Sequence, residues 1–589
     1  MIINDIKKCI YYNKNENIIF KAFEFIIEKS ESNYIEIYVH NINFDGLIIL
    51  NEISKEKINF SIRFLKENIY FIEIFFLNKT IKFRCSYKII PLSLKILGKI
   101  ENEEKGVFPY KFVSFDTLFY IGKYPDIKYW EKGDFSYLNE NKIFDLKKET
   151  MIYCLKDVII TQKVLKKILD IIYIEDKNII KKCFSAGSLS HNLFYIKYNY
   201  KNIEKNIKKI DEIFIRESYF GGRCEIFGNI FDDEHVKYFD FSGMYGQCME
   251  EEFHTGCGTI SYEESWEKIG FHKIEYESYN NYMPILPTKS QNKKLIFANG
   301  INIGTFWYEE IKLFKKKGGK IIRVIESFIY EKKEKVFDNF ILNFNNIRKK
   351  GGYYKIFGKL MINSLYGGMG LKDDDTYNYI TFSKKEYDYI NESMDVLKKY
   401  EVNSTYILSI EKNYKSKIFL KKKNIKEDDK SKRNVSYSSA IASKARIKLY
   451  NAMEGVENNE GRVLYCDTDS IFAAYKNNNL EKKNGDIEWI SFYKDAVFAG
   501  AKTYALKSEK DEIKIKGIKN GDIKFEEFKD FFYNEKTIKF KDQLNFKKNS
   551  LNIEQIYLEK EIDFGLYDKR IFIDKKKKTI PINLNIKKK

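Results

Sequence analysis

Two aspartates stand one residue apart where an apolar run is interrupted and then resumes. Residues 464–472 read LYCDTDSIF, so Asp467 and Asp469 flank one threonine between two strand-like runs. The pattern predicts a β-hairpin with both acids at its tip. Because residues two apart on an extended chain face the same way, both carboxylates could reach one divalent cation. Taken alone, the motif also suits a structural turn, since Asp and Thr are common turn formers.

A further acid ends a second apolar segment. Residues 236–241 read VKYFDF, which predicts a buried strand that delivers Asp240 immediately before the turn SGMYGQ. Phosphoryl transfer at two hard cations about 4 Å apart needs acids from separate strands to bridge them. Asp240 together with Asp467 and Asp469 meets that need.

Residues 355–367, KIFGKLMINSLYG, carry polar side chains at helical spacing. Four of them recur every three or four positions: Lys355, Lys359, Asn363 and Tyr366. That spacing predicts one helical face with two ammonium groups, an amide and an aromatic ring. Such a face could bind a triphosphate with its sugar and base stacked nearby, because lysine binds phosphate as a point charge. A solvated amphipathic face would show the same spacing, so the neighbouring motifs decide between the two interpretations.

A large folded protein must position these residues. The chain has 589 residues, of which 44% are hydrophobic and 16% aromatic, which predicts several packed units and excludes a disordered or fibrous protein. Its net charge of +19 favours a polyanionic partner such as nucleic acid or an anionic lipid surface. Its longest apolar runs fall short of the roughly 20 residues of a membrane span, so we expect no membrane insertion. Eight cysteines without a CxxC pair and five scattered histidines indicate neither a disulfide framework nor a zinc site.

The remaining patterns indicate a mixed α/β chain. In residues 34–50, apolar and polar side chains alternate up to the sequence Asn-Phe-Asp-Gly, after which an apolar run follows. This pattern predicts a strand, a turn and a second strand. Residues 161–173 predict a helix that begins at a Thr161 cap. Residues 420–434 are strongly polar and predict an exposed loop, and residues 574–589 predict a basic extension that is either solvated or in contact with nucleic acid. Residues 436–453 predict a helix whose small residues suit packing beneath a sheet.

In chain order, DFSGMY, KLMINSLYG and YCDTDS resemble the three polymerase motifs DxxSLYP, KxxxNSxYG and YxDTDS of family B DNA polymerases. YFGGR at 219–223, KTY at 502–504 and YDKR at 567–570 followed by TIPI resemble the protein-primed branch of that family, which includes phage and linear mitochondrial plasmid polymerases. The resemblance covers nearly the whole chain. It implies an α/β multidomain fold, with a right-hand polymerase of palm, fingers and thumb after an N-terminal RNase H-like exonuclease domain that looks truncated.

The resemblance also implies roles at the reacting centre. Asp240 and Asp469 would be the principal ligands of two Mg²⁺ ions, with Mn²⁺ as an alternative. The carbonyl of Phe241 would be a main-chain ligand, and Asp467 a close neighbour of the other acids.

Other matched residues would bind the substrates. Tyr245 would be a steric gate for the deoxynucleoside triphosphate. Lys355 and Lys359 would bind its phosphates, with the amide of Asn363 on the same helix face. The ring of Tyr366 would lie near the nascent base pair. Arg348 lies where the family places another phosphate contact. The primer terminus would contact Lys502 and Tyr504, and the template strand Tyr219, Gly221 and Gly222. Gly243 and Gly246 replace the usual Ser and Pro, and we expect them to loosen the turn near Tyr245.

The N-terminal part resembles a 3′→5′ exonuclease incompletely. Asn41 and Asp45 lie in HNINFDG, which looks like the second exonuclease motif, and Tyr153 and Asp157 lie in YCLKD, which looks like the third. A DxE first motif is missing. A reading frame truncated just past that strand and a vestigial proofreading site both remain open. In either case we expect weak exonuclease activity, because acids that fix two cations act together.

The spacing of the motifs divides the chain into expected regions, two of which are insertions. The first insertion would dock a terminal protein, and the second would give processivity and strand displacement. The regions are residues 1–165 (exonuclease-like), 166–215 (linker), 216–254 (first palm part), 255–330 (terminal-protein insertion), 331–369 (fingers), 370–434 (processivity insertion), 435–510 (second palm part) and 511–589 (thumb and basic tail). We expect the first insertion to be separable from the palm. Unrelated decoration of the palm is the alternative for both insertions.

The expected function is therefore DNA-directed DNA synthesis, with protein-primed replication of a linear element. Its partners would be template and primer DNA, deoxynucleoside triphosphates and a terminal protein supplied in trans. Its compartment would be the mitochondrion if the gene is plasmid- or organelle-encoded, although no targeting signal is readable. A reverse transcriptase or viral RNA polymerase should show a different acid pair and no KxxxNSxYG helix. A catalytically degenerate DNA-binding accessory protein should have lost palm acids, and all three are present.

Overall fold

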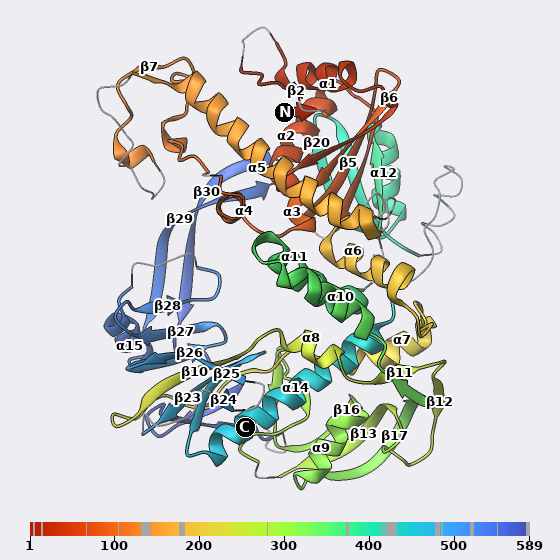
Figure 1. Ribbon diagram of the computed structural model, residues 1–589, viewed down its shortest axis with the longest axis vertical. Helices are drawn as coiled ribbons and strands as arrows, with labels where there is room; N and C mark the ends of the chain where they lie inside the picture. Colours follow the sequence, from red (N-terminus) through yellow and green to blue (C-terminus); the bar gives the residue numbers. More distant parts are fainter. Residues whose placement is uncertain are drawn as a thin grey trace.

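The computed structural model, drawn in Figure 1, describes most of the chain. The residues outside its description are 4–5, 13–15, 66–67, 104, 131–142, 176–178, 180–182, 280, 373–375, 414–415, 417–418, 420–432, 477–482, 485–486, 519–522, 550–551 and 585–589. The expected loop at 420–434 thus lies almost wholly outside the described residues.

The N-terminal region is a four-stranded sheet with helices around it. The strand order is β3-β6-β5-β4, with β3 parallel to β6 and the other pairs antiparallel. Its elements are α1 (Ile18–Glu28), β3 (Tyr34–Val39), α2 (Ile42–Lys55), β4 (Phe60–Leu65), β5 (Asn68–Phe76), β6 (Lys79–Cys85), α3 (Ser86–Ile89), α4 (Leu94–Ile100) and α5 (Leu146–Glu175). Short pieces accompany them: β1 (Ile2–Ile3), β2 (Ile6–Lys7), η1 (Tyr110–Phe112), β7 (Ile121–Gly122), η2 (Ile127–Tyr129) and β8 (Phe144–Asp145).

The strand, turn and strand expected for residues 34–50 is wrong in its second half. The first strand is present as β3, but Asn-Phe-Asp-Gly opens helix α2. Ile42, Leu50 and Ile53 are fully buried at helical spacing, so a helix buries this apolar face where a strand would divide it. Asn41 takes the left-handed conformation, with φ 68°, and turns the chain from strand to helix.

In the next segment the helix expected at residues 161–173 is present, but its expected start is wrong, and the expected linker is folded. Helix α5 begins well before Thr161, and Asp145 caps it by accepting a hydrogen bond from Lys148 N at 3.1 Å. Thr161 lies inside the helix, where its hydroxyl donates to the carbonyl of Asp157 at 2.9 Å. Residues 166–215, expected to be a linker, form the end of α5, α6 (Ala186–Leu193), the π-helical turn η4 (Phe194–Tyr198) and α7 (Lys209–Arg216), and their apolar side chains join the largest core.

A six-stranded antiparallel sheet lies at the centre of the polymerase-like half. Its order is β24-β25-β10-β23-β22-β9. The strands are β9 (Cys224–Ile226), β10 (His235–Phe241), β22 (Arg462–Asp467), β23 (Ser470–Tyr475), β24 (Lys483–Asn484) and β25 (Ile487–Tyr493). The expected strand at 236–241 and the expected hairpin at 464–472 are both present, and they lie side by side.

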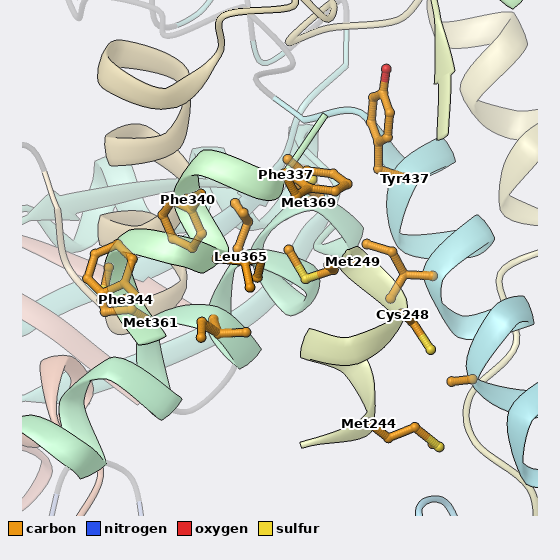
Figure 2. Close-up of a cluster of buried hydrophobic side chains, with 14 of the residues drawn as sticks. Met244, Cys248, Met249, Phe337, Phe340, Phe344, Met361, Leu365, Met369 and Tyr437 are labelled. Atoms are coloured by element: carbon orange, nitrogen blue, oxygen red, sulfur yellow. The ribbon is translucent and has the colours of Figure 1, made fainter. Parts of the chain in front are cut away.

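Four helices pack together beside this sheet. They are α8 (Met244–Met249), α10 (Asp338–Lys349), α11 (Gly352–Gly370) and α14 (Val435–Asn458). Figure 2 shows how their buried side chains meet: Met244, Cys248, Met249, Phe337, Phe340, Phe344, Met361, Leu365, Met369 and Tyr437. The small residues of α14 are buried and the helix contacts β22 and β23, as its sequence predicts.

Residues 255–330, expected to be the first insertion, share a buried core with the helices beside the central sheet. Its main sheet has the order β12-β17-β13-β16. The elements of this region are β11 (Phe253–Thr255), β12 (Thr259–Ser261), β13 (Gly270–Ser278), β14 (Pro287–Lys289), β15 (Leu295–Phe297), β16 (Gly300–Trp307), α9 (Tyr308–Lys316), β17 (Lys320–Ile329) and β18 (Lys332–Glu334). Phe271, Trp307 and Phe328 belong to the same buried cluster as Phe337 and Tyr437. The expectation of a separable region is therefore wrong, because removing it would expose this core.

The second insertion packs on the N-terminal sheet. It contains β19 (Thr376–Thr381), α12 (Lys384–Ser393), β20 (Val396–Val402) and β21 (Thr405–Glu411), in the sheet order β19-β21-β20. Val402 and Ile407 share a buried cluster with Ile72 and Ile81 of the N-terminal sheet. Asn403 Nδ2 also donates to the carbonyl of Asn51 at 3.1 Å.

The C-terminal region begins with a small sheet and a long hairpin. Its elements are β26 (Asp495–Gly500), β27 (Thr503–Lys507), β28 (Glu512–Lys514), α15 (Phe525–Tyr533), β29 (Thr537–Asn549), β30 (Asn552–Asp563), β31 (Arg570–Ile573) and β32 (Lys578–Pro581). In Figure 1 the hairpin β29–β30 rises from this sheet toward the N-terminal region, where β30 contacts α2.

The described part of the expected basic tail is folded. Strands β31 and β32 form a hairpin, and Thr579 N donates to the carbonyl of Phe227 beside strand β9 at 3.0 Å. Arg570 is 1% exposed and donates to Thr579 Oγ1 at 2.8 Å. Thr579 and Pro581 form the buried face of β32, whereas Lys578 and Ile580 are exposed, so residues 574–584 are not simply a solvated end, and a nucleic-acid contact by their exposed lysines stays a prediction.

No helix in the part of the chain that the structure describes has both the length and the hydropathy needed to cross a lipid bilayer.

Candidate functional site

Three acids from two neighbouring pairs of strands meet at one end of the central sheet. Strand β10 pairs with β23 so that Asp240 stands opposite Ser470, and β22 pairs with β23 so that Asp467 also stands opposite Ser470. Asp469 lies in the two-residue loop between them. Phe241 N donates to the carbonyl of Asp469 at 2.9 Å, which ties this loop to the end of β10.

The loop shape differs from the extended chain assumed for Asp467 and Asp469. Thr468 takes the left-handed conformation, with φ 63°, so the alternation of side chains along a strand does not apply across it. Thr468 N donates to the carbonyl of Arg223 at 2.7 Å, and a Cβ on Gly222 would stand 2.7 Å from Thr468 Cγ2. The glycine segment ahead of β9 thus fixes the loop by direct contact.

The carboxylates repel one another in a half-buried setting. Burial, and then the nearby Asp469 carboxylate, raise the pKa of Asp240, and Lys359 opposes that shift. Burial also raises the pKa of Asp469, with a contribution from Asp467 and opposition from Lys359 and Lys502. A cation at this end of the sheet would neutralise the repulsion.

The side chains alone do not complete a metal site. Among the described residues, no three His, Cys, Asp or Glu side chains converge as a metal-binding group. The predicted ligand set accordingly depends on two carboxylates, Asp240 and Asp469, with the main-chain oxygen of Phe241. That oxygen accepts a hydrogen bond from Gly243 N at 2.7 Å, and a carbonyl has a second lone pair available for an ion.

The predicted helix carries its polar residues on one face. In α11, Lys355 and Lys359 are exposed and Asn363 and Tyr366 are half-buried. The opposite face is buried, including Phe357, Met361 and Leu365. Lys359 is close enough to Asp240 and Asp469 to affect both carboxyl groups. The helix therefore presents a positive charge to the acids.

A cavity of about 200 Å³ lies between the turn after Asp240 and two helices. Its polar lining comprises Ser242, Gln247, Glu250, Asn345, Arg348, Lys359 and Asn363. A Cβ on Gly358 would stand 2.6 Å from the Arg348 side chain and from the Phe344 carbonyl, so the glycine lets α10 approach α11 closely. This approach brings Arg348 to the same cavity as Lys359.

Tyrosines from three segments pack together beside the acids. Tyr245 and Tyr366 stack with ring centroids 4.2 Å apart and planes 13° apart, and Tyr219 meets Tyr366 edge-on at 6.4 Å. The glycines near Tyr245 do not loosen this arrangement. Gly243 adopts φ 80° at the start of α8, and a Cβ on Gly246 would stand 3.0 Å from Ile362, so both serve close packing.

A second cavity, of about 300 Å³, lies beside the acid loop. It is lined by Asp467, Asp469, Lys502 and Tyr504, together with Tyr238, Tyr465, Thr468, Ser470, Phe472 and Lys514. Lys502 Nζ stands 3.9 Å from Asp467 Oδ1. The KTY residues expected near a primer terminus are thus beside the acids.

Sequence reasoning missed two residues at this cavity. Tyr465 is fully buried, and its hydroxyl accepts a hydrogen bond from Lys502 N at 2.9 Å. It stands first in YCDTDS, which is a usable signal. Lys514 lies on β28, and its position beside Tyr504 depends on strand pairing that no local pattern reveals.

The exonuclease-like residues lie on two helices. Asp45 is in the first turn of α2, just after Asn41, whereas Tyr153 and Asp157 are on α5. Burial raises the pKa of the Cys154 thiol, and the carboxylates of Asp157 and, more weakly, Asp45 raise it further. Both carboxylates are therefore near that thiol. The four matched residues thus fall in one part of the N-terminal region.

Two acids ahead of Asp45, Glu24 and Glu36, are candidates to replace the missing first motif. Glu36 is paired with Arg84 at 3.2 Å. Glu24 lines a separate cavity of about 630 Å³ with Lys8, Lys21 and Lys147.

The chain matches one family model and several curated relatives. Residues 26–459 match the model described as DNA polymerase type B, organellar and viral. A probable DNA polymerase of Podospora anserina is 27% identical over 80% of this chain and 43% of its own length, and one of Agaricus bitorquis is 26% identical over 95% and 77%. The DNA-directed DNA polymerase of Enterobacteria phage PRD1 is 27% identical over 52% of each chain. The chain thus spans about half the length of some relatives.

Among solved structures, the fold matches the Phi29 DNA polymerase complexed with primer-template DNA and incoming nucleotides. The TM-score is 0.64 at 16% identity, over 92% of this chain and 93% of the other. The fold is therefore that of a type B DNA polymerase over most of the chain.

Proposed function

Because this chain belongs to the organellar and viral type B DNA polymerases, we propose that it catalyses template-directed DNA synthesis from deoxynucleoside triphosphates. The observation that carries the proposal is the meeting of Asp240 and Asp469 with Lys359 at one end of the central sheet. Primer extension by the purified protein, with primed DNA, four nucleotides and Mg²⁺, tests it. Binding of primed DNA without any extension would favour the nonenzymatic accessory role.

The proposed donors, two carboxylates and a main-chain carbonyl, are the hard oxygen ligands that divalent cations such as Mg²⁺ prefer. Asp240, Asp469 and the Phe241 carbonyl would hold Mg²⁺, or Mn²⁺ as an alternative, with Asp467 beside them. When bound, the ions would lower the barrier to attack by the primer 3′-hydroxyl and stabilise charge on the phosphates. The raised pKa of both carboxyl groups supports this assignment, since a cation relieves their repulsion.

The nucleotide would lie across the face of α11. Lys359 and Arg348, which share a cavity, would contact its phosphates, with Lys355 one turn earlier on the helix. Asn363 would stand beside the sugar. The Tyr245 ring, held by its stack on Tyr366, would lie under the sugar and reject a 2′-hydroxyl.

The DNA strands would approach from the two sides of the acid loop. Lys502 and Tyr504 would hold the primer terminus, because they line the cavity next to Asp467. Tyr219, Gly221 and Gly222 would contact the template strand. Gly221 has open space around it, so a nucleic-acid backbone could come close.

The expected regions of the chain would take the roles of polymerase subdomains. We propose palm at 216–254 and 435–510, fingers at 331–369, thumb from 511 onward, and an exonuclease-like domain at 1–165. The second insertion, which packs on the N-terminal sheet, would close around the template. The fungal relatives and the organellar family support replication of a linear element in the mitochondrion.

Initiation would use the hydroxyl of a terminal protein docked on the first insertion. The outer face of its sheet exposes Ile301 and Ile303, at 44% and 47%. These two residues pair across strands with Glu277 and Glu275. Deleting the region would destroy the shared core, so surface substitutions provide the cleaner test.

We expect Ile301→Lys/Ile303→Lys to reduce protein-primed initiation by about 10-fold, because it replaces the two exposed apolar side chains of the proposed docking face by charged ones. Extension of an ordinary DNA primer should stay unchanged. Labelled-nucleotide transfer to the terminal protein measures the first quantity, and Ile571→Lys, on an exposed strand elsewhere, is the control. Equal initiation by all three proteins would refute docking on this face.

We expect the chain to degrade single-stranded DNA much more slowly than it extends a primer. Asp45 and Asp157 lack a DxE partner, and Glu36 is paired with Arg84. Release of labelled 3′ nucleotides measures the rate, and Asp157→Ala is the comparison. A rate similar to synthesis that Asp157→Ala abolishes would mean that another acid, such as Glu24, supplies the missing ligands.

A further inference from the structure

Two glutamates in the first turn of α9 reach helix α14. Glu309 accepts a hydrogen bond from Lys444 Nζ at 2.6 Å, and Lys444 also donates to Glu251 at 2.9 Å. Glu310 accepts from Arg446, whose Nε and Nη2 each donate to one of its oxygens at 2.7 Å. Two ion pairs therefore join the first insertion to the palm helix.

The Arg446 guanidinium holds a second set of acceptors. Its Nη1 donates to the carbonyls of Phe220 at 2.9 Å and Gly221 at 3.3 Å. Side-chain exposure is 3% for Arg446 and 2% for Glu310, so water has little access to these groups. A planar guanidinium can serve a carboxylate and two carbonyls at once, a geometry that an ammonium group does not reproduce.

The backbone held by Arg446 lies against the acid loop. The main-chain carbonyl of Arg223, two residues after Gly221, accepts a hydrogen bond from Thr468 N. Gly222 packs on the Thr468 side chain. Thr468 separates the two acids of the loop. Because close-packed contacts transmit displacement, the position of this backbone limits the position of the loop.

We infer that Glu310 and Arg446 are positioning residues for DNA synthesis, which hold the backbone of residues 219–222 and, through it, the loop that carries the acids. The inference rests on the proposed polymerase function. It gives the first insertion a part in the extension of ordinary DNA primers, separate from its proposed role in initiation.

Arg446→Lys tests the inference while it keeps a buried positive charge beside Glu310. We expect amide hydrogens of residues 217–226 to exchange faster with deuterium than in the wild type. We also expect kcat/KM for primed DNA to fall by about 10- to 100-fold, since small misplacement of a reacting site is costly. The KM for the incoming nucleotide should be unchanged, and rates expressed per folded enzyme exclude a loss that comes only from general destabilisation.

A second variant covers the case in which Arg446→Lys does not fold. Glu310→Leu/Arg446→Met replaces the pair by apolar side chains and leaves no unpaired buried charge. It removes the donors to Phe220 and Gly221, so the same two changes are expected.

Glu309→Gln is the matched control, because it breaks the neighbouring ion pair on the same helix turn without touching residues 220–221. It should behave as the wild type in both measurements. Wild-type exchange and kcat/KM in the folded test variants would overturn the inference, and so would equal losses in Glu309→Gln. A wild-type protein that synthesises no DNA would instead refute the proposed function, while the exchange measurement would still report on the backbone segment.

Discussion

DNA synthesis should fall by at least about 10³-fold when Asp469 or Asp240 is replaced by asparagine, because an amide keeps the shape and removes the charge that recruits the cations. Binding of primed DNA should remain nearly intact. Single-nucleotide incorporation under saturating Mg²⁺ measures the first quantity, and a DNA titration measures the second.

Folding can be separated from chemistry in these variants. Each carboxyl group has a raised pKa in the folded protein, so above that pKa its ionised form destabilises the fold. Removing one charge should leave the thermal unfolding temperature equal or higher. Asp233→Asn is the control, since Asp233 is exposed and pairs with Lys476 away from the site. Normal incorporation by either test variant would refute the metal assignment.

Lys359→Ala should lower kcat/KM for the incoming nucleotide by about 10- to 100-fold, the value of a lost hydrogen bond to a charged group. The affinity for duplex DNA should change little, because the net charge of +19 is spread over many basic residues besides Lys359. Steady-state kinetics with varied nucleotide and a separate DNA titration measure the two effects.

Lys349→Ala supplies the comparison, because Lys349 is exposed at the end of α10 and outside the cavity that Lys359 lines. It should reproduce wild-type kinetics. If Lys359→Ala instead weakened DNA binding and left nucleotide use unchanged, the α11 face would be a duplex contact.

Local patterns predicted the parts of the site that depend on a few adjacent residues. The strand before Asp240, the hairpin around Asp467 and Asp469, and the polar face of α11 each follow from periodicity over a short window. Their convergence at one sheet end was predicted from the motifs taken together.

Other features depend on partners far away in sequence. Thr468 adopts φ 63° where it abuts Gly222, a contact that strand alternation does not encode. The Arg446–Glu310 pair joins residues 136 positions apart. Helix α2 was mistaken for a turn because Asn-Phe-Asp-Gly favours turns locally, whereas burial of Ile42 and Leu50 against the sheet decides the outcome.

The hairpin β31–β32 sets the order in which the palm can be completed during synthesis on the ribosome. The Phe227 carbonyl is made early, yet its partner Thr579 N emerges about 350 residues later, which takes roughly 20 to 70 seconds at typical elongation rates. During that interval the edge beside β9 lacks its neighbour. The hydrogen bond that holds this edge therefore forms only after residue 579 has been made, so the edge beside β9 is among the last parts of the central sheet to reach its final form.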